Sequence, residues 1–139
     1  MATPAIELIP YLSFDGNGEE ALNFYKEILN GRIDVMTRYD NPAMQVPEDY
    51  KNKILHARFY FGDQTIFASD VMPGKAGNQP SGRVALSLGL QDEELAKKIF
   101  DQLAVGGTIG VPYAKQFWGD WHGNLIDRFG ICWMLNAAK

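Results

Sequence analysis

The internal repeat constrains the fold of this chain more than any other feature of its sequence. Each half of the 139 residues has the same order of expected elements: a strand, a helix and then three strands. A shift of 75 positions matches the apolar faces of the two expected helices, pairing Ala21 with Ala96, Phe24 with Ile99, Tyr25 with Phe100 and Ile28 with Leu103. A four-stranded half cannot bury both faces of its sheet alone. We therefore expect two βαβββ modules that pair within one α+β domain.

Module 1 is expected at about residues 5–70. Its helix begins after Asn17, because Asn17 and Glu20 have the spacing of a capping box, and it ends at Asn30-Gly31. The inward face of this helix is expected to hold Ala21, Phe24, Tyr25, Ile28 and Leu29. Alternating apolar and polar residues predict strands at residues 6–14, 32–39, 54–61 and 65–69, with a loop at 40–53.

Residues 71–82 contain two prolines and three glycines and are the clearest linker in the chain. Module 2 follows at about residues 83–137. Asp92 is expected to cap its helix, and Gly106-Gly107 to end it. The inward face of this helix is expected to hold Leu95, Ala96, Ile99, Phe100 and Leu103. Strands are expected at residues 83–90, 108–112, 115–118 and 131–136, and His122 in a glycine-rich loop.

Charge and cysteine content exclude several classes of protein. The net charge is −4 with no run of Lys or Arg, which argues against nucleic acid and anionic membranes as partners. Cys132 is the only cysteine, so an intramolecular disulfide and a cysteine-rich zinc site are excluded. No apolar run approaches the ~20 residues that span a membrane, and no signal peptide is visible at the N-terminus. We expect a cytoplasmic protein.

Several motifs together resemble the PhnB-like proteins of the vicinal-oxygen-chelate superfamily, which includes glyoxalases, bleomycin-resistance proteins and extradiol dioxygenases. The motifs are the segment 9–17 (IPYLSFDGN), Glu20-Ala21, Phe24-Tyr25-Lys26, His56-Ala57, Ser69-Asp70-x-Met72-Pro73, Phe117-Trp118-Gly119 and the segment 127–133 (DRFGICW). The resemblance covers nearly the whole chain. It implies two modules whose curved sheets enclose a small-molecule cleft, and a homodimer.

The resemblance also implies a divalent metal held by His or Glu side chains at matching positions of the two modules. Those positions here are near Leu8 to Pro10, at Phe67 or Ala68, at Arg83 and at about Met134. None of them offers the expected ligand, so we predict that the standard metal site is missing and that the chain uses no cofactor. A non-standard site built from His56 and His122 with Asp70 or Glu7 stays open. We find no glycine-rich segment that would cradle the adenosyl cofactor of a methyltransferase.

His56, Arg83 and Tyr11 are candidate ligand-binding residues of the cleft. His56 shares one face of its strand with Arg58 and Tyr60, which suits either a pocket wall or a structural histidine. As a general base it would need an orienting partner, for which Asp70 is a guess. Arg83 could bind a carboxylate or phosphonate, or pair on the surface. Tyr11 could line the cleft or fill the core.

Phe117, Trp118 and Trp121 form a dense aromatic group near Gly119 and Gly123. Such a group suits a ligand pocket, a dimer interface or core packing, and we expect at least one of its members to meet a ligand or partner. With Asp70 and Met134, these residues complete the set of candidate ligand contacts.

The sequence leaves more than one function open. A metal-free protein that binds a small molecule needs only a shaped cleft with aromatic walls and a few polar groups, and this is our first hypothesis. An enzyme with a non-standard metal site, similar to glyoxalases or dioxygenases, is the alternative. A third possibility is an assembly role for the aromatic loop.

Overall fold

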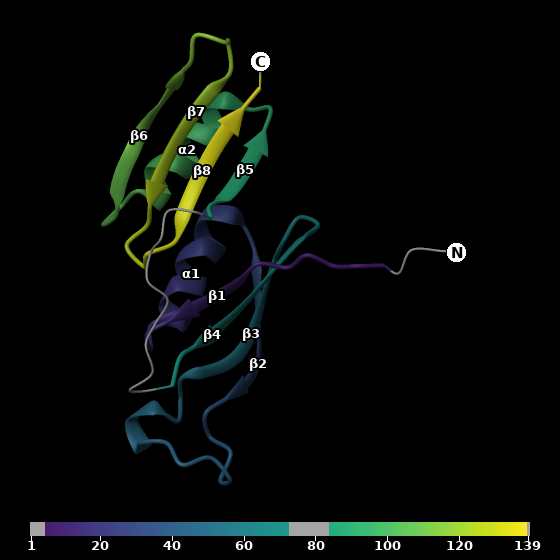
Figure 1. Ribbon diagram of the computed structural model, residues 1–139, viewed down its shortest axis with the longest axis vertical. Helices are drawn as coiled ribbons and strands as arrows, with labels where there is room; N and C mark the ends of the chain where they lie inside the picture. Colours follow the sequence, from purple (N-terminus) through teal and green to yellow (C-terminus); the bar gives the residue numbers. More distant parts are fainter. Residues whose placement is uncertain (1–4, 73–83, 139) are drawn as a thin grey trace. The chain divides into compact units, whose positions relative to one another are not determined.

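The computed structural model describes residues 5–72 and 84–138 and divides into two compact units, Met1–Gly77 and Asn78–Lys139. Each unit has the βαβββ order, with a four-stranded sheet and a helix along one of its faces (Figure 1). The predicted fold class is therefore confirmed. Arg83 and most of the predicted linker lie outside the described residues.

The first unit contains a mixed sheet in the order β1-β4-β3-β2. Strand β1 pairs in parallel with β4, whereas β4 and β2 both pair antiparallel with β3. Its elements are β1 (Tyr11–Phe14), α1 (Gly18–Leu29), β2 (Arg32–Arg38), a 3₁₀ turn (Glu48–Tyr50), β3 (Ile54–Phe61) and β4 (Gln64–Asp70).

The second unit repeats this topology in the order β5-β8-β7-β6, again with one parallel pair, β5 and β8. Its elements are β5 (Leu86–Leu90), α2 (Glu93–Leu103), β6 (Thr108–Lys115), β7 (Trp121–Ile126) and β8 (Cys132–Ala137). The repeat detected in the sequence is thus a repeat of topology.

Each sheet has one face packed against its own helix and one face turned away from it, which we call the open face. In the first unit the helix face buries Phe59, whose ring lies 6.5 Å from that of Tyr25 on α1. Gly31, which follows α1, lies so close to Phe59 that a Cβ there would meet the ring at 2.4 Å. Because side chains alternate along a strand, His56 and Arg58 of β3 fall on the open face.

Strand β1 begins at Tyr11, so the prediction of a strand from Ile6 is wrong at its start. Ile6 and Leu8 are 86% and 96% exposed. The regular pairing of β1 with β4 starts at Tyr11 and Phe67, although the Phe67 amide also donates to the carbonyl of Pro10. The apolar alternation begins before the residues that pair in the sheet, so the sequence pattern predicted too long a strand.

Strands β6 and β7 differ most from the prediction. Strand β6 contains the strand expected at 108–112 and continues to Lys115, whereas the second strand expected at 115–118 does not form. The register of β6 with β7 shifts on either side of Val111. Such irregularities accommodate Pro112, which cannot donate to a ladder. His122 lies on β7 and not in a loop. The sequence did not predict β7, because its glycine and polar residues are more typical of a loop than of a strand.

The two helices begin in different ways. Asp92 accepts hydrogen bonds from the amides of Glu94 and Leu95, which confirms the predicted cap of α2. Asn17 makes no side-chain cap on α1, so the predicted capping box is wrong. The inward faces also differ in detail, since Leu22 is fully buried whereas Leu95 is 45% exposed. Neither helix is long and apolar enough to cross a membrane among the described residues.

Candidate functional site

Tyr11, His56, Phe67 and Arg58 form one cluster on the open face of the first unit. The Tyr11 hydroxyl lies 3.2 Å from Nδ1 of His56. The Phe67 ring packs edge-on against both neighbours, with ring centroids 6.2 Å from Tyr11 and 5.0 Å from His56. The guanidinium carbon of Arg58 lies 5.0 Å from the centroid of the Phe67 ring. The structure thus brings the predicted residues Tyr11 and His56 together and adds Arg58 and Phe67.

Asp70 has a different role from the predicted one. It is 1% exposed, and its carboxylate accepts hydrogen bonds from the amides of Gly16, Gly18 and Ile54 at 2.8–3.1 Å. It alternates with Ser69 and so lies on the helix face, where it caps α1 from a distant strand. Asp70 is therefore a structural residue, and the guess that it orients His56 is not supported.

A row of hydrogen-bonded side chains crosses the open face of the second unit. Nδ1 of His122 lies 2.8 Å from Oδ1 of Asn136, and Nδ2 of Asn136 donates to the Ser87 hydroxyl at 2.7 Å. An amide oxygen only accepts, so His122 carries its proton on Nδ1 in this arrangement. In the neutral imidazole Nε2 then presents its lone pair, and the Ser87 proton is left for another acceptor. Sequence reasoning missed Ser87 and Asn136, because nothing local marks them.

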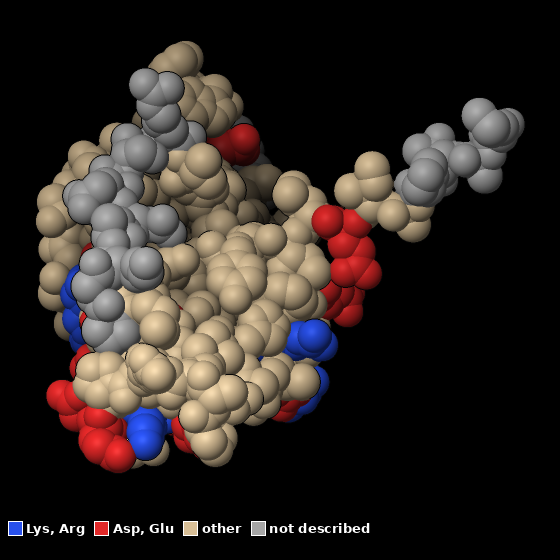
Figure 2. Space-filling view, turned by 60° about the horizontal axis from the view of Figure 1, so that its bottom comes forward, with Lys and Arg blue, Asp and Glu red and all other residues tan. Residues whose placement is uncertain are grey.

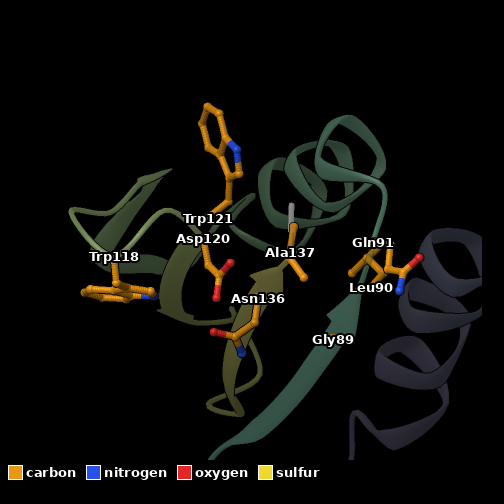
Figure 3. Close-up of a pocket in the computed structure, with 9 residues that line it drawn as sticks. Gly89, Leu90, Gln91, Trp118, Asp120, Trp121, Asn136 and Ala137 are labelled. Atoms are coloured by element: carbon orange, nitrogen blue, oxygen red, sulfur yellow. The ribbon is translucent and has the colours of Figure 1, made fainter.

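A hollow of about 350 Å³ adjoins this row where β5 and β8 end and β7 begins. Figure 3 shows Asp120 between the flat Trp118 ring and the Asn136 amide, with the Trp121 ring directed away from them. Gly89 is one of the residues that line the hollow, and a Cβ added to it would meet nothing within 4 Å. The hollow therefore combines an aromatic ring, a carboxylate and an amide.

The predicted aromatic group separates into residues with different surroundings. Trp121 stacks on Tyr113 at 5.5 Å and 21°, which is a packing contact. Phe117 is 98% exposed and touches Trp118 edge-on at 4.9 Å. Of the three, Trp118 offers the ring that best suits a ligand in the hollow.

Met134 lines a second, mainly apolar hollow of about 370 Å³ at the other end of the same open face. The hollow is lined by Ala85, Thr108, Gly110, Asn124, Leu125, Ile126, Cys132, Trp133 and Met134. Cys132 is half-buried in this apolar setting. No acidic or basic side chain lines this hollow within the described part of the chain.

The residues present do not fit the metal of the superfamily. Within residues 5–72 and 84–138, no three His, Cys, Asp or Glu side chains gather closely enough to hold a metal ion. The open-face positions of the four strands in parallel pairs hold no imidazole or carboxylate: they are Tyr11 and Ser13 on β1, Thr65, Phe67 and Ser69 on β4, Ser87 and Gly89 on β5, and Cys132, Met134 and Asn136 on β8. Hydroxyls, amides, one thioether and the single thiol of Cys132 are a poor donor set for a catalytic divalent metal.

Surface charges of both signs lie close together. Arg38 pairs with Glu19 and Lys51 with Glu48, at 3.0 and 2.8 Å. Figure 2 likewise shows acidic and basic side chains as neighbours within small groups on the face in view. Uncharged surface separates these groups.

Comparison with known proteins identifies relatives over nearly the full chain. Residues 6–136 match the family model described as 3-demethylubiquinone-9 3-methyltransferase. The chain is 30% identical to Protein YjdN of Escherichia coli K12, covering 95% of each chain. Protein PA1353 from Pseudomonas aeruginosa has a similar structure, with a TM-score of 0.84 at 35% identity, covering 96% of this chain and 98% of that one.

Two further solved structures have a similar fold. The PhnB protein from Bacillus cereus superposes with a TM-score of 0.80 at 26% identity, covering 96% of this chain and all of that one. The fosfomycin resistance protein FosX from Listeria monocytogenes has a TM-score of 0.66 at 12% identity, with 99% and 95% coverage, which shows the fold alone. The chain therefore belongs to the PhnB-like family that the 3-demethylubiquinone-9 3-methyltransferase model describes, and it has the vicinal-oxygen-chelate fold.

Proposed function

We propose that this PhnB-like chain binds a small neutral or cationic molecule on the open face of its second sheet, without a divalent metal. The observation that carries the proposal is the row Ser87–Asn136–His122, which leads into the hollow beside Trp118. Ligand sites combine apolar walls with a few placed polar groups, and this surface has both.

The donors and acceptors left over in the row define which hydrogen-bonding groups a ligand would need. Nε2 of His122 accepts a hydrogen bond, and the Ser87 hydroxyl donates one. Among the described residues, neither atom has another partner for this purpose. A ligand with one donor and one acceptor would satisfy both groups.

The hollow favours positive over negative charge on the ligand. Asp120 places a carboxylate there, and the Trp118 ring is 55% exposed, so its face could receive an ammonium group. The net charge of −4 acts in the same direction. A small amine that carries a hydroxyl group matches the hollow and the row together.

Gly89→Trp tests the proposal directly, because the new ring would fill the hollow where the glycine leaves open space. A thermal-shift and calorimetric panel of benzylamine, choline and ethanolamine would be measured on the wild type and on the variant. We expect at least one probe to bind the wild type and to bind Gly89→Trp about tenfold or more weakly, which is about 1.4 kcal/mol.

Gly89→Ala is the matched control and should bind like the wild type, since a methyl group fits the open space. Equal binding by Gly89→Trp would remove the hollow from the proposal. The metal-free part is tested by repeating the titration after EDTA treatment. Loss of binding that added Zn²⁺, Ni²⁺, Mn²⁺ or Fe²⁺ restores would favour the alternative, an enzyme with a non-standard metal site.

A further inference from the structure

We propose that the open face of the first sheet carries a site for a small oxyanion, a carboxylate or phosphate group, with Arg58 as its main ligand. The site lies on a different sheet from the one described under the proposed function and takes the opposite charge. Each of the two proposals can therefore fail without the other.

The first step is that the Arg58 side chain has a hydrogen-bond donor without a partner. Its Nε atom has no contact with solvent and no hydrogen-bond partner, the one buried side-chain polar atom of this kind in the described part of the chain. A guanidinium keeps its charge and offers five N–H donors. Buried donors without partners are rare in folded proteins, and each calls for an explanation. Since Nε itself is closed off from solvent, an acceptor on this face would meet the terminal Nη atoms, which are not among the buried unpartnered atoms of the described residues.

The second step is that the acidic side chains near Arg58 are already engaged. Asp34 is its cross-strand neighbour, but the Asp34 carboxylate lies 2.7 Å from Nη1 of Arg32. Asp70 lies on the helix face with three backbone amides bonded to it. No ion pair involves Arg58 across residues 5–72 and 84–138. The guanidinium therefore remains available to an external anion.

The third step concerns the surroundings of the guanidinium. The guanidinium carbon lies over the Phe67 ring, 5.0 Å from its centroid, and a guanidinium is a planar fork suited to two oxygens of one oxyanion. Nearby, the Tyr11 hydroxyl can donate a hydrogen bond to Nδ1 of His56. The His56 ring then carries a proton on Nε2, which is a second donor beside Arg58. The rings of Tyr11 and Phe67 add an apolar wall. The arrangement suits an oxyanion attached to a flat apolar group.

Arg32 provides a matched control for Arg58. It lies on the neighbouring strand of the same sheet and also stacks on a ring, 4.6 Å from the centroid of Tyr60. Unlike Arg58, however, it has a carboxylate partner in Asp34. Arg32→Met removes the same charge as Arg58→Met without removing the unpartnered donor.

Benzoate, phenyl phosphate and inorganic phosphate are the probes, titrated at constant ionic strength with chloride as the reference anion. Arginine Nε–Hε signals in ¹H–¹⁵N NMR spectra report changes in the surroundings of each guanidinium. We expect the Arg58 signal to move on titration, and Arg58→Met to weaken binding about tenfold or more, or about 1.4 kcal/mol. Arg32→Met should stay within about twofold, less than 0.5 kcal/mol. Benzoate and phenyl phosphate then show which oxyanion is preferred.

An Arg58 signal that none of the probes moves would overturn the proposal. So would equal weakening by Arg32→Met, which would indicate attraction by net charge alone. If Arg58→Met does not fold, Arg58→Lys serves in its place, because lysine keeps the charge but lacks the planar fork. Unchanged binding by Arg58→Lys would also contradict a fork that holds two oxygens.

Discussion

At the scale of single residues, Asp70 shows how burial decides the role of an acidic side chain. The sequence places it next to polar Ser69 at the end of a strand, which is also how a pocket carboxylate would look. The alternation of β4 turns it to the helix face instead, where three backbone amides surround it. Even Gly18 is constrained by this contact, since a Cβ there would lie 2.8 Å from Oδ1.

We predict that Asp70→Asn lowers the free energy of unfolding by about 1–3 kcal/mol, because the amide nitrogen cannot accept the hydrogen bonds that a carboxylate oxygen accepts. Urea denaturation would measure the loss. Asp63→Asn, in the exposed turn before β4, is the control and should change stability by less than about 0.5 kcal/mol. A loss of similar size in both variants would contradict the capping role of Asp70.

At the scale of elements, the two helices differ in where their N-terminal amides find acceptors. For α2 the acceptor is local, since Asp92 bonds to the amides two and three residues further along the chain. For α1 it is remote, since the Asp70 carboxylate reaches Gly18 from 52 residues away. Only the local cap is visible in a sequence pattern.

We therefore predict that Asp92→Ala costs about 1 kcal/mol of stability, as the loss of an N-cap usually does. Asn17→Ala should cost less than about 0.5 kcal/mol, because Asn17 makes no side-chain cap. Urea unfolding of both variants under the same conditions measures the difference. Equal losses would indicate that Asn17 caps α1 in solution.

At the scale of the whole molecule, the two units repeat a topology but not its open-face chemistry. Tyr11, Phe67 and Arg58 lie opposite one another across three strands, and Ser87, Met134 and Asn124 take the same places in the second unit. His56 and His122 therefore also correspond, two residues before Arg58 and Asn124. At these matching positions one face is cationic and aromatic and the other neutral and polar, so the two proposals assign them different ligands.

The pH dependence of stability is also a property of the whole molecule. A hydrogen bond from Arg38 lowers the pKa of Glu19 below 4.5, against the opposing effect of burial. Burial, together with nearby acidic groups, raises the pKa of Tyr113 above 10.0. The lowered pKa contributes stability above about pH 4.5, which is lost as pH falls through the folded-state value. The raised pKa contributes below about pH 10 and is lost as pH rises through it.

We predict that Glu19→Gln flattens the acid limb of the stability profile and that Tyr113→Phe flattens the alkaline limb. The Glu19 effect should stay below about 1 kcal/mol, because the pair is partly exposed to solvent. Thermal unfolding between pH 3 and pH 11 provides the profile. Arg38→Met should reproduce the acid-limb change of Glu19→Gln, and an acid limb identical to that of the wild type in either variant would contradict the pairing.

The sequence alone determined those features that a short stretch of chain encodes. The period of apolar residues predicted both helices, the strand from Ile54 to Phe61 and the repeat of the βαβββ order. Asp92 was predicted as a cap because its partners are its neighbours. The Tyr11 and His56 side chains were predicted as candidates for one site, and the fold brings them together.

The tertiary structure decided which distant residues meet, because strand register and sheet face determine those contacts. A shift of one residue in β8 would turn Asn136 away from Ser87, 49 residues distant, and from His122. In the same way, Asp70 became a cap and Arg58 an unpartnered donor through the faces to which β4 and β3 turn them. Local periodicity carries no record of such pairings, so the chemistry of both open faces emerges only from the folded chain.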